Sequence, residues 1–266
     1  MEDNQEVEQG KTKEAILSFK KCISLNPDYS HAYSNMGIAL NDQGKSEEAI
    51  KAFKKALFLK SDYAETHVNL SLILLNSGKI KEGLDEYEWR WKTAKGFSRQ
   101  RHFSKPIWDG KKSLKRKKIL IWYEQGIGDT INWSSYLSFI ISLSEQCILE
   151  CQEKLVPLLK RSFPRIEVRS ENRLLDLERE DFDYHLPMGN LYKHFKPKIS
   201  NAVKIEPFLV PDPDRVKYWT KRLKSLGIGP FIGISWKSSN LMSNRLQNYS
   251  SLVQWAPILK IPNVTF

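Results

Sequence analysis

The stretch Lys118-Ile-Leu-Ile-Trp-Tyr-Glu-Gln-Gly-Ile-Gly-Asp-Thr130 decides the fold of the region in which it lies. Its apolar residues from Ile119 onward predict a buried strand that ends at Glu124. Gly126 and Gly128 then predict a tight turn, and a helix is expected to begin near Asp129. Turns of this kind place backbone N–H groups and one or two side chains at the mouth of an α/β domain, so we expect functional groups here.

The sequence after this turn alternates between short apolar strands and amphipathic helices. Strands are predicted at Cys147–Cys151, Arg165–Arg169 and Asp183–Met188. The first helix carries a stripe of Trp133, Tyr136, Leu137, Ile140 and Ile141, and the next carries Leu155, Leu158, Leu159 and Phe163. Strands that alternate with helices through short connections predict a parallel sheet of the doubly wound type.

A further helix closes this sheet domain, which we place at residues 118–229. It begins at the cluster Pro211-Asp-Pro-Asp214 and carries Val216, Trp219, Leu223 and Leu226. Residues 230–266 then start a second unit. Its predicted parts are a strand at Phe231–Trp236, a short helix with Leu252, Trp255, Ala256 and Pro257 near its end, and the start of a strand at Val264–Phe266. Such a short unit cannot bury both of its faces, so either it packs onto the preceding sheet or the sequence is a fragment.

The first third of the chain, residues 1–91, repeats with a period of 34 residues. Gly10, Gly44 and Gly78 form one series with this spacing. Each copy predicts two helices that cross closely at small residues, with aromatic side chains in the groove beside them. The copies cover residues 1–29, 30–63 and 64–91. The first copy is partial, because its first helix would lie before Met1, and we therefore expect the chain to start inside a longer array.

The best copy resembles the tetratricopeptide repeat. Tyr33, Met36, Gly37 and Leu40 mark its first helix, and Ala49, Phe53, Ala56 and Leu57 mark its second. The departures are small, since Ser71 replaces the usual glycine and Ser61 stands where proline is common. These residues are expected to serve packing, and the resemblance implies a concave face that binds a peptide or an acceptor protein.

A basic segment at residues 92–117 joins the repeats to the sheet domain. Over residues 92–118 the chain has eleven Lys or Arg residues and one acid, Asp109. Either this segment is a solvated linker, or it is a patch for an anionic partner such as a phosphorylated donor, a membrane surface or nucleic acid. Nucleic acid is the weakest of these, because no recognised binding motif accompanies the charge. Trp89 and Trp91 are too close to share one helix face, so one is expected to pack on the repeats and the other, with Trp108 of the segment, on the next domain.

The composition is typical of a soluble globular protein, with 41% hydrophobic and 27% charged residues. The acidic, polar N-terminus is not a secretory signal, and no apolar run is long enough to span a membrane, so we expect a cytoplasmic protein, with the inner face of the membrane as a peripheral location. Cys22, Cys147 and Cys151 have no metal-binding spacing, and neither do the histidines, so we predict no metal site. The two later cysteines fall on one face of a strand and are expected to be buried free thiols.

Three motifs in chain order resemble one family. They are Tyr87-Glu-Trp-Arg-Trp91 with Pro106-Ile-Trp-Asp-Gly110, then Glu124-Gln-Gly-Ile-Gly-Asp129, then Gly233-Ile-Ser-Trp236 with Arg245. Together they are similar to bacterial tetratricopeptide-repeat proteins fused to a glycosyltransferase domain of the heptosyltransferase-like type, and more distantly to O-linked N-acetylglucosamine transferases. The resemblance implies a GT-B fold, in which the N-terminal sheet domain takes the acceptor and the C-terminal one, largely missing from this sequence, binds the nucleotide-sugar.

The resemblance also implies roles for single residues. Asp129 matches the aspartate proposed as general base, and a carboxylate placed to take the acceptor's proton suits an inverting transfer that needs no metal. Glu124, Gln125, Gly126 and Gly128 would line the substrate side of the turn. Lys237, Ser238 and Arg245 would lie where a diphosphate binds, and Trp236 would be a platform for the sugar. No cofactor is implied, since the nucleotide-sugar is a substrate.

Simpler interpretations stand beside these roles. Asp129 could be only a helix N-cap, Glu124 could pair with the basic segment, and Lys237 and Arg245 could be surface charges. Trp236 could belong to a core. Two functions therefore remain open: a glycosyltransferase, or a piece of one, and a non-catalytic repeat adaptor with a remnant α/β domain.

Overall fold

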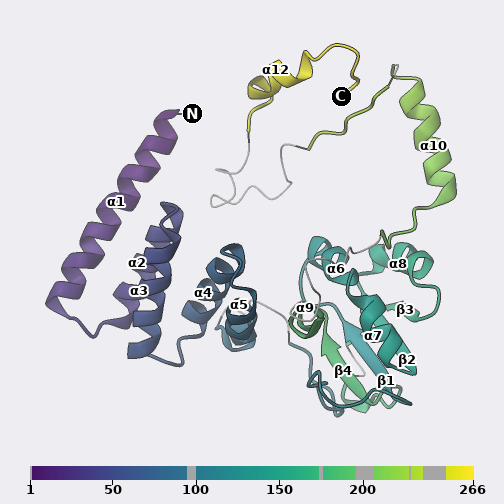
Figure 1. Ribbon diagram of the computed structural model, residues 1–266, viewed down its shortest axis with the longest axis horizontal. Coiled ribbons are helices and arrows are strands. Elements are labelled where there is room, and N and C mark those ends of the chain that lie inside the picture. The colour runs from purple at the N-terminus through teal and green to yellow at the C-terminus, as the bar shows by residue number, and fades with distance from the viewer. Residues whose placement is uncertain (1, 95–99, 174–175, 196–206, 228, 236–249) are drawn as a thin grey trace. The chain divides into compact units, whose positions relative to one another are not determined.

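The structure, a computed structural model, describes residues 2–94, 100–173, 176–195, 207–227, 229–235 and 250–266, with the backbone alone for residues 2–10. Residues 6–210 form one compact unit, and residues 211–266 belong to a second. The first unit holds the helices of the repeats and a four-stranded sheet (Figure 1).

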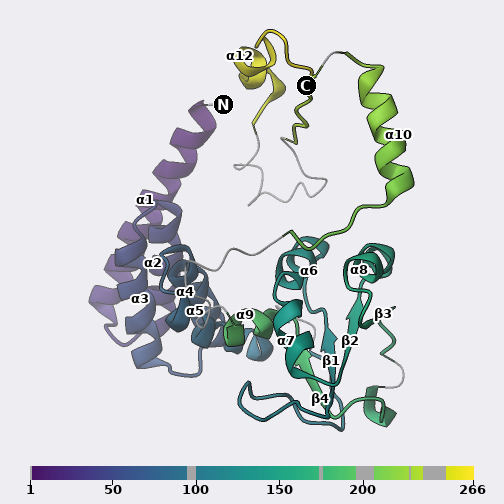
Figure 2. The same cartoon turned by 45° about the vertical axis from the view of Figure 1, so that its right-hand side comes forward.

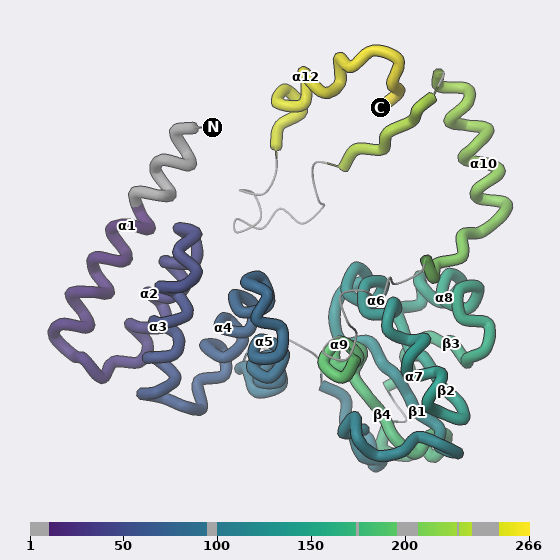
Figure 3. Tube along the Cα trace, in the orientation of Figure 1, coloured from purple at the N-terminus to yellow at the C-terminus, as the bar shows by residue number. Residues whose placement is uncertain are grey.

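The 34-residue period corresponds to successive helix pairs (Figure 3). The helices are α1 (Glu2–Leu25), α2 (Ser30–Asp42), α3 (Ser46–Leu59), α4 (Ala64–Asn76) and α5 (Ile80–Tyr87). Gly44 and Gly78 have φ angles of +73° and +75°, a left-handed conformation that glycine adopts without strain, and they form the turns within two pairs. A Cβ on Gly37 would lie 2.8 Å from the ring of Phe53, so a small residue is needed where α2 and α3 cross.

The first copy differs from the others, because α1 continues through Gly10, the position equivalent to the two turn glycines. Residues 2–9 are polar apart from Val7 and therefore have no apolar stripe that could fold back on the rest of α1. A last short helix, η1 (Glu88–Lys92), follows α5 and ends the repeats.

The sheet is entirely parallel and has the strand order β3-β2-β1-β4. Figures 1 and 2 show its strands side by side. The strands are β1 (Lys118–Trp122), β2 (Gln146–Cys151), β3 (Glu167–Ser170) and β4 (Tyr184–Pro187). Ile121 of β1 pairs with Leu149 on one side and Leu186 on the other. All four predicted strands are confirmed, with ends that differ by one or two residues.

Helices cover one face of the sheet. They are α6 (Ile127–Ser134), α7 (Leu137–Leu143), α8 (Val156–Ser162) and α9 (Gly189–Phe195). Ile119 and Ile121 of β1 and both cysteines of β2 point into the core that these helices form with the sheet. The prediction of buried free thiols at Cys147 and Cys151 is confirmed, and burial raises the pKa of each thiol to about 12.

The opposite face of the sheet is covered differently. There Leu120, Trp122 and Ile148 pack against Phe182, with Trp91 and Phe103 beside them. A doubly wound sheet carries α-helices on both faces, whereas among the described residues this face carries the segment that joins the repeats to β1 and the connection from β3 to β4, which includes the short helix η3 (Asp176–Glu178).

One predicted helix is two helices in the structure. The apolar stripe from Trp133 to Ile141 predicts a single helix, but α6 ends at Ser134 and α7 begins at Leu137. The hydroxyls of Ser134 and Ser135 donate to the carbonyls of Thr130 and Asn132, and such local bonds compete with a regular helix.

In the second unit one predicted helix is present, and the predicted strands and the short helix differ from the prediction. Helix α10 (Pro213–Lys224) begins as predicted, since the Asp212 carboxylate accepts from the backbone N–H groups of Asp214 and Arg215. It was expected to close the sheet domain, but it belongs to the second unit and has no buried residue, so that placement is wrong. In place of the strands predicted at 231–236 and 264–266, the described residues form a single parallel bridge between Phe231 and Thr265, as expected for strands without further partners. The short helix is split into η5 (Leu252–Trp255) and α12 (Ala256–Leu259). Pro257 lies in the first turn of α12 rather than near its end, because a proline there removes no helical hydrogen bond.

Candidate functional site

The site lies beyond the carboxyl ends of β1 and β4. From β1 the chain moves to β2 and β3 on one side, and then returns to place β4 on the other side of β1. In open parallel sheets, ligands bind outside the strand ends where the order reverses in this way. Two turns meet at this point: residues 123–126 after β1, and residues 188–189 after β4.

Asp129 is exposed at the start of α6. The N-cap is Gly126, and Asp129 is the third residue of the helix, so the interpretation of Asp129 as the N-cap is wrong in position. Its carboxylate still caps the helix, because Oδ2 accepts from the Gly126 N–H at 3.1 Å. A carboxylate in the first turn is also favoured by the helix dipole.

The two glycines of the turn face open space. A Cβ on Gly128 would meet nothing within 4 Å, and one on Gly126 would meet only the Asp129 carboxylate at 3.4 Å. Packing within the described chain therefore does not require glycine at either position.

Glu124 is held below the turn and is fully buried. Its Oε2 accepts from Arg90 Nε at 2.7 Å, and its Oε1 accepts from Arg90 Nη2 and from the Gly189 N–H, both at 3.0 Å. The suggestion that Glu124 pairs with the basic segment is wrong, because its partner comes from η1 at the end of the repeats. Sequence reasoning missed Arg90, although an arginine between two tryptophans in Trp89-Arg-Trp91 indicates a buried cation.

Arg90 has no exposed side-chain surface, and all five of its N–H groups have acceptors. In addition to Glu124, it donates to the Tyr87 carbonyl, to Glu88 and to Asn190 Oδ1. The rings of Tyr87 and Trp91 lie 4.5 and 4.2 Å from its guanidinium carbon. Burial, and then the charge of Glu124, raise the pKa of Tyr87.

The tryptophans beside Arg90 divide as predicted. Trp89 stacks on His67 of α4, with ring centroids 3.9 Å apart, and Trp91 contacts Trp122 of β1 at 5.8 Å. Trp108 is buried in the helix-covered core. Gln125 also links the repeats to the sheet, since its Nε2 donates to the Tyr87 hydroxyl at the end of α5 and its carbonyl accepts from Gln152 after β2. The repeats and the sheet are therefore joined through several buried contacts.

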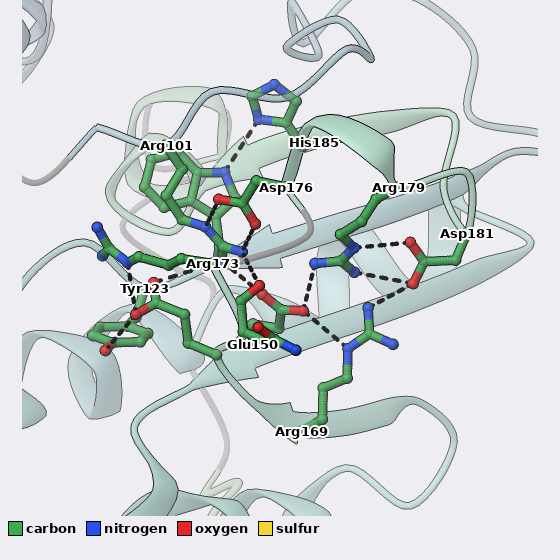
Figure 4. A network of polar contacts seen from close by, with 12 residues as sticks. Arg101, Tyr123, Glu150, Arg169, Arg173, Asp176, Arg179, Asp181 and His185 are labelled. Atoms are coloured by element: carbon green, nitrogen blue, oxygen red, sulfur yellow. Dashed lines mark hydrogen bonds and ion pairs between the residues drawn. The ribbon is translucent and has the colours of Figure 1, made fainter.

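A second polar cluster is centred on Glu150 (Figure 4). Glu150 lies two residues after Ile148 on β2 and so faces the same side of the sheet, opposite the helices. Glu150 is buried in β2 and accepts from Arg101, Arg169 and Arg179 at 2.6 to 2.9 Å. Asp176 and Asp181 bind these arginines from the other side. A cavity of about 310 Å³ lies beside them. Sequence reasoning missed this cluster, although a glutamate inside the apolar strand Cys147–Cys151 requires buried partners.

The basic segment is partly neutralised. Arg101 is buried against Glu150 and Asp176, Lys105 pairs with Glu180, and Lys117 binds Asp183 at 2.9 Å. These three cations are therefore committed to acids of the sheet domain rather than left as a solvated linker.

The other predicted site residues, Trp236, Lys237, Ser238 and Arg245, lie outside the described residues. Within the described part, no three His, Cys, Asp or Glu side chains are grouped to hold a metal ion. No helix of that part has both the length and the apolar character that a membrane crossing needs.

Two families of known repeats match the N-terminal part. The family described as "Tetratricopeptide repeat" matches residues 30–63, and the family described as "TPR repeat" matches residues 4–44. The first match has the same bounds as the copy predicted from the 34-residue period. The chain therefore contains tetratricopeptide repeats.

Protein FlbA of Caulobacter vibrioides is 31% identical to this chain over 269 residues. The match covers 95% of this chain and 45% of FlbA, so the chain spans less than half of that relative's length. Among solved structures, MamA is 22% identical with a TM-score of 0.30 over 31% of this chain and 48% of its own. The second repeat domain of Spaghetti (RPAP3), solved with an HSP90 peptide, is 23% identical with a TM-score of 0.30 over 32% of this chain and 80% of its own.

Proposed function

We propose that this chain is the acceptor-binding half of a glycosyltransferase that moves a sugar from a nucleotide-sugar to a hydroxyl of a protein held by the repeats. The observation that carries the proposal is the contact between Arg90 and Glu124. This contact joins the end of the repeats to the turn that precedes α6 and Asp129. A partner bound by the repeats would therefore lie near an exposed carboxylate.

Asp129 suits the role of general base. Its carboxylate is exposed at the reversal of strand order, where ligands of parallel sheets bind. Taking the proton of an acceptor hydroxyl as it attacks the anomeric carbon contributes roughly 10²–10⁴-fold to the rate. The open space in front of Gly128 supports close approach of a substrate to the backbone.

The repeats supply the protein partner. Ile38 of α2 and Leu72 of α4 lie 34 residues apart, in equivalent positions of two copies, and are 40% and 42% exposed. Exposed apolar side chains that recur with the repeat suit an extended segment of a partner protein.

The donor belongs to the second unit of the GT-B fold. We assign the acceptor domain to the sheet, whose compact unit ends at residue 210 rather than at the expected 229, and the start of the donor domain to residues 230–266. Trp236, Lys237, Ser238 and Arg245 would contact the nucleotide-sugar, with the cations balancing the charge of the leaving diphosphate without a metal. Glu124 and Gln125 hold the backbone of the turn in place through their hydrogen bonds to Arg90 and Tyr87.

The test is Asp129→Asn, measured as sugar transfer by the full-length protein. We expect turnover to fall by about 10²–10⁴-fold. The fold should persist, because the asparagine Oδ1 can still accept from the Gly126 N–H. Asp212→Asn is the matched control, since Asp212 also caps a helix start, that of α10, and should leave turnover unchanged. Equal turnover in wild type and Asp129→Asn would rule out the general-base role.

The second candidate is a non-catalytic adaptor. It is favoured by the burial of Glu124, whose two oxygens are both held by Arg90 and the Gly189 N–H, as in a carboxylate that serves the fold. Calorimetric titration of the 266-residue chain and of the full-length protein with nucleoside diphosphates separates the two candidates. Binding by the full-length protein supports the transferase, whereas no heat from either protein supports the adaptor.

A further inference from the structure

Arg90 occupies a position that no catalytic role explains. It belongs to η1, yet its guanidinium lies between the turns that follow β1 and β4. It is bonded to Glu124 in the first turn and to Asn190 in the first turn of α9, directly after the second. One side chain from the repeats thus contacts the turn after β1 and the start of the helix that follows β4.

The turn after β4 is built around the same carboxylate. The Gly189 N–H donates to Glu124 Oε1, and a Cβ on Gly189 would lie 2.5 Å from that oxygen. The Glu124 carboxylate can shift only if Arg90 releases it, because Arg90 supplies its two other hydrogen bonds. The position of Glu124 is therefore set jointly by Arg90 and by the Gly189 backbone.

Glu124 in turn fixes the start of the turn that carries Asp129. Only Gln125 separates Glu124 from Gly126, whose N–H is capped by Asp129 and whose carbonyl accepts from the Thr130 N–H. A displacement of Glu124 therefore moves the first turn of α6 and the Asp129 carboxylate with it.

We propose that Arg90 is a positioning residue through which the repeats set the geometry of the Asp129 turn. It touches no substrate and acts only through Glu124 and Asn190. The consequence for catalysis rests on the function proposed above, whereas the consequence for the turn itself does not.

The test compares Arg90→Lys with wild type by hydrogen–deuterium exchange of residues 124–130 and 188–191. Lysine keeps the charge but cannot bond Glu124 through two parallel N–H groups. We expect the Gly126, Thr130 and Gly189 amides to exchange about tenfold faster or more in the variant. Arg179→Lys is the control, because Arg179 is also buried against carboxylates, Glu150 and Asp181, and touches neither turn. Unchanged exchange in Arg90→Lys, or an equal increase in Arg179→Lys, would overturn the proposal.

Transfer by the full-length protein gives a second measurement. Misplacement of Asp129 should lower kcat by up to about 10²-fold and leave the KM for the nucleotide-sugar unchanged. If wild type transfers no sugar, the proposed function fails and exchange alone decides the role of Arg90. If Asp129→Asn abolishes transfer while Arg90→Lys alters neither exchange nor kcat, the positioning role fails and the function stands.

Discussion

Removing Arg90 should cost more free energy of unfolding than its place in a short terminal helix suggests. Arg90→Met leaves the Glu124 carboxylate in a site with no exposed surface, with the Gly189 N–H as its remaining donor. A buried charge left without its partner costs about 3–5 kcal/mol. Glu124→Gln should cost less, about 2–3 kcal/mol, because Glu88 and Asn190 still bind the guanidinium.

The double variant Arg90→Met with Glu124→Gln separates the ion pair from the packing around it. It buries no charge at this point, and the glutamine can still accept from the Gly189 N–H. We expect a total cost of about 1–3 kcal/mol, lower than the sum of the two single costs by at least about 2 kcal/mol.

The assay is equilibrium unfolding in urea, followed by tryptophan fluorescence, since Trp91 stacks on the Arg90 guanidinium and contacts Trp122. The urea concentration at the midpoint should shift, with little change in the slope of the unfolding free energy against urea concentration. The exposed pair Lys54–Glu82 is the control, and its coupling should stay below about 0.5 kcal/mol. A double variant whose cost equals the sum of the single costs within about 0.5 kcal/mol would refute the coupling.

Two further predictions concern groups buried in the sheet domain. Burial lowers the pKa of His185 from 6.5 to about 4. Between pH 6.5 and 4 the unfolded chain binds a proton at this histidine and the folded chain does not, so stability should fall by up to roughly 3 kcal/mol over that range as the pH is lowered. His185→Gln should remove this part of the pH dependence in urea unfolding, and an unchanged pH profile would contradict the assignment. In thiol labelling at pH 8, Cys22 should react in the native protein and the two β2 cysteines only on unfolding, whereas early labelling of all three would contradict the buried core.

The sequence predicts the local parts of the fold well, for physical reasons. A 34-residue spacing constrains helix pairs strongly, because small residues must recur where helices cross, as Gly37 does against Phe53. Short apolar runs between helices likewise predict parallel strands. The position of Asp129 at a helix start follows from Gly126 and Gly128 alone.

Long-range polar pairs could not be predicted in the same way. The partners in the pair Arg90–Glu124 are 34 residues apart, and those in Arg101–Asp176 are 75 apart. Neither pairing leaves a periodic signal. Charge counting therefore places Arg101 in a basic linker, although its side chain is buried.

The repeats and the connecting segment complete the sheet domain. The face of the sheet opposite the helices is covered by residues from the connecting segment, such as Phe103, and by Trp91 from the end of the repeats. Without them Leu120 and Trp122 would be exposed and the Glu150 carboxylate would lose Arg101. A sheet with one uncovered apolar face is not stable by itself. The repeats, the connecting segment and the sheet are therefore expected to fold as one unit, and the repeats serve as part of the domain that carries Asp129 rather than as a separate appendage.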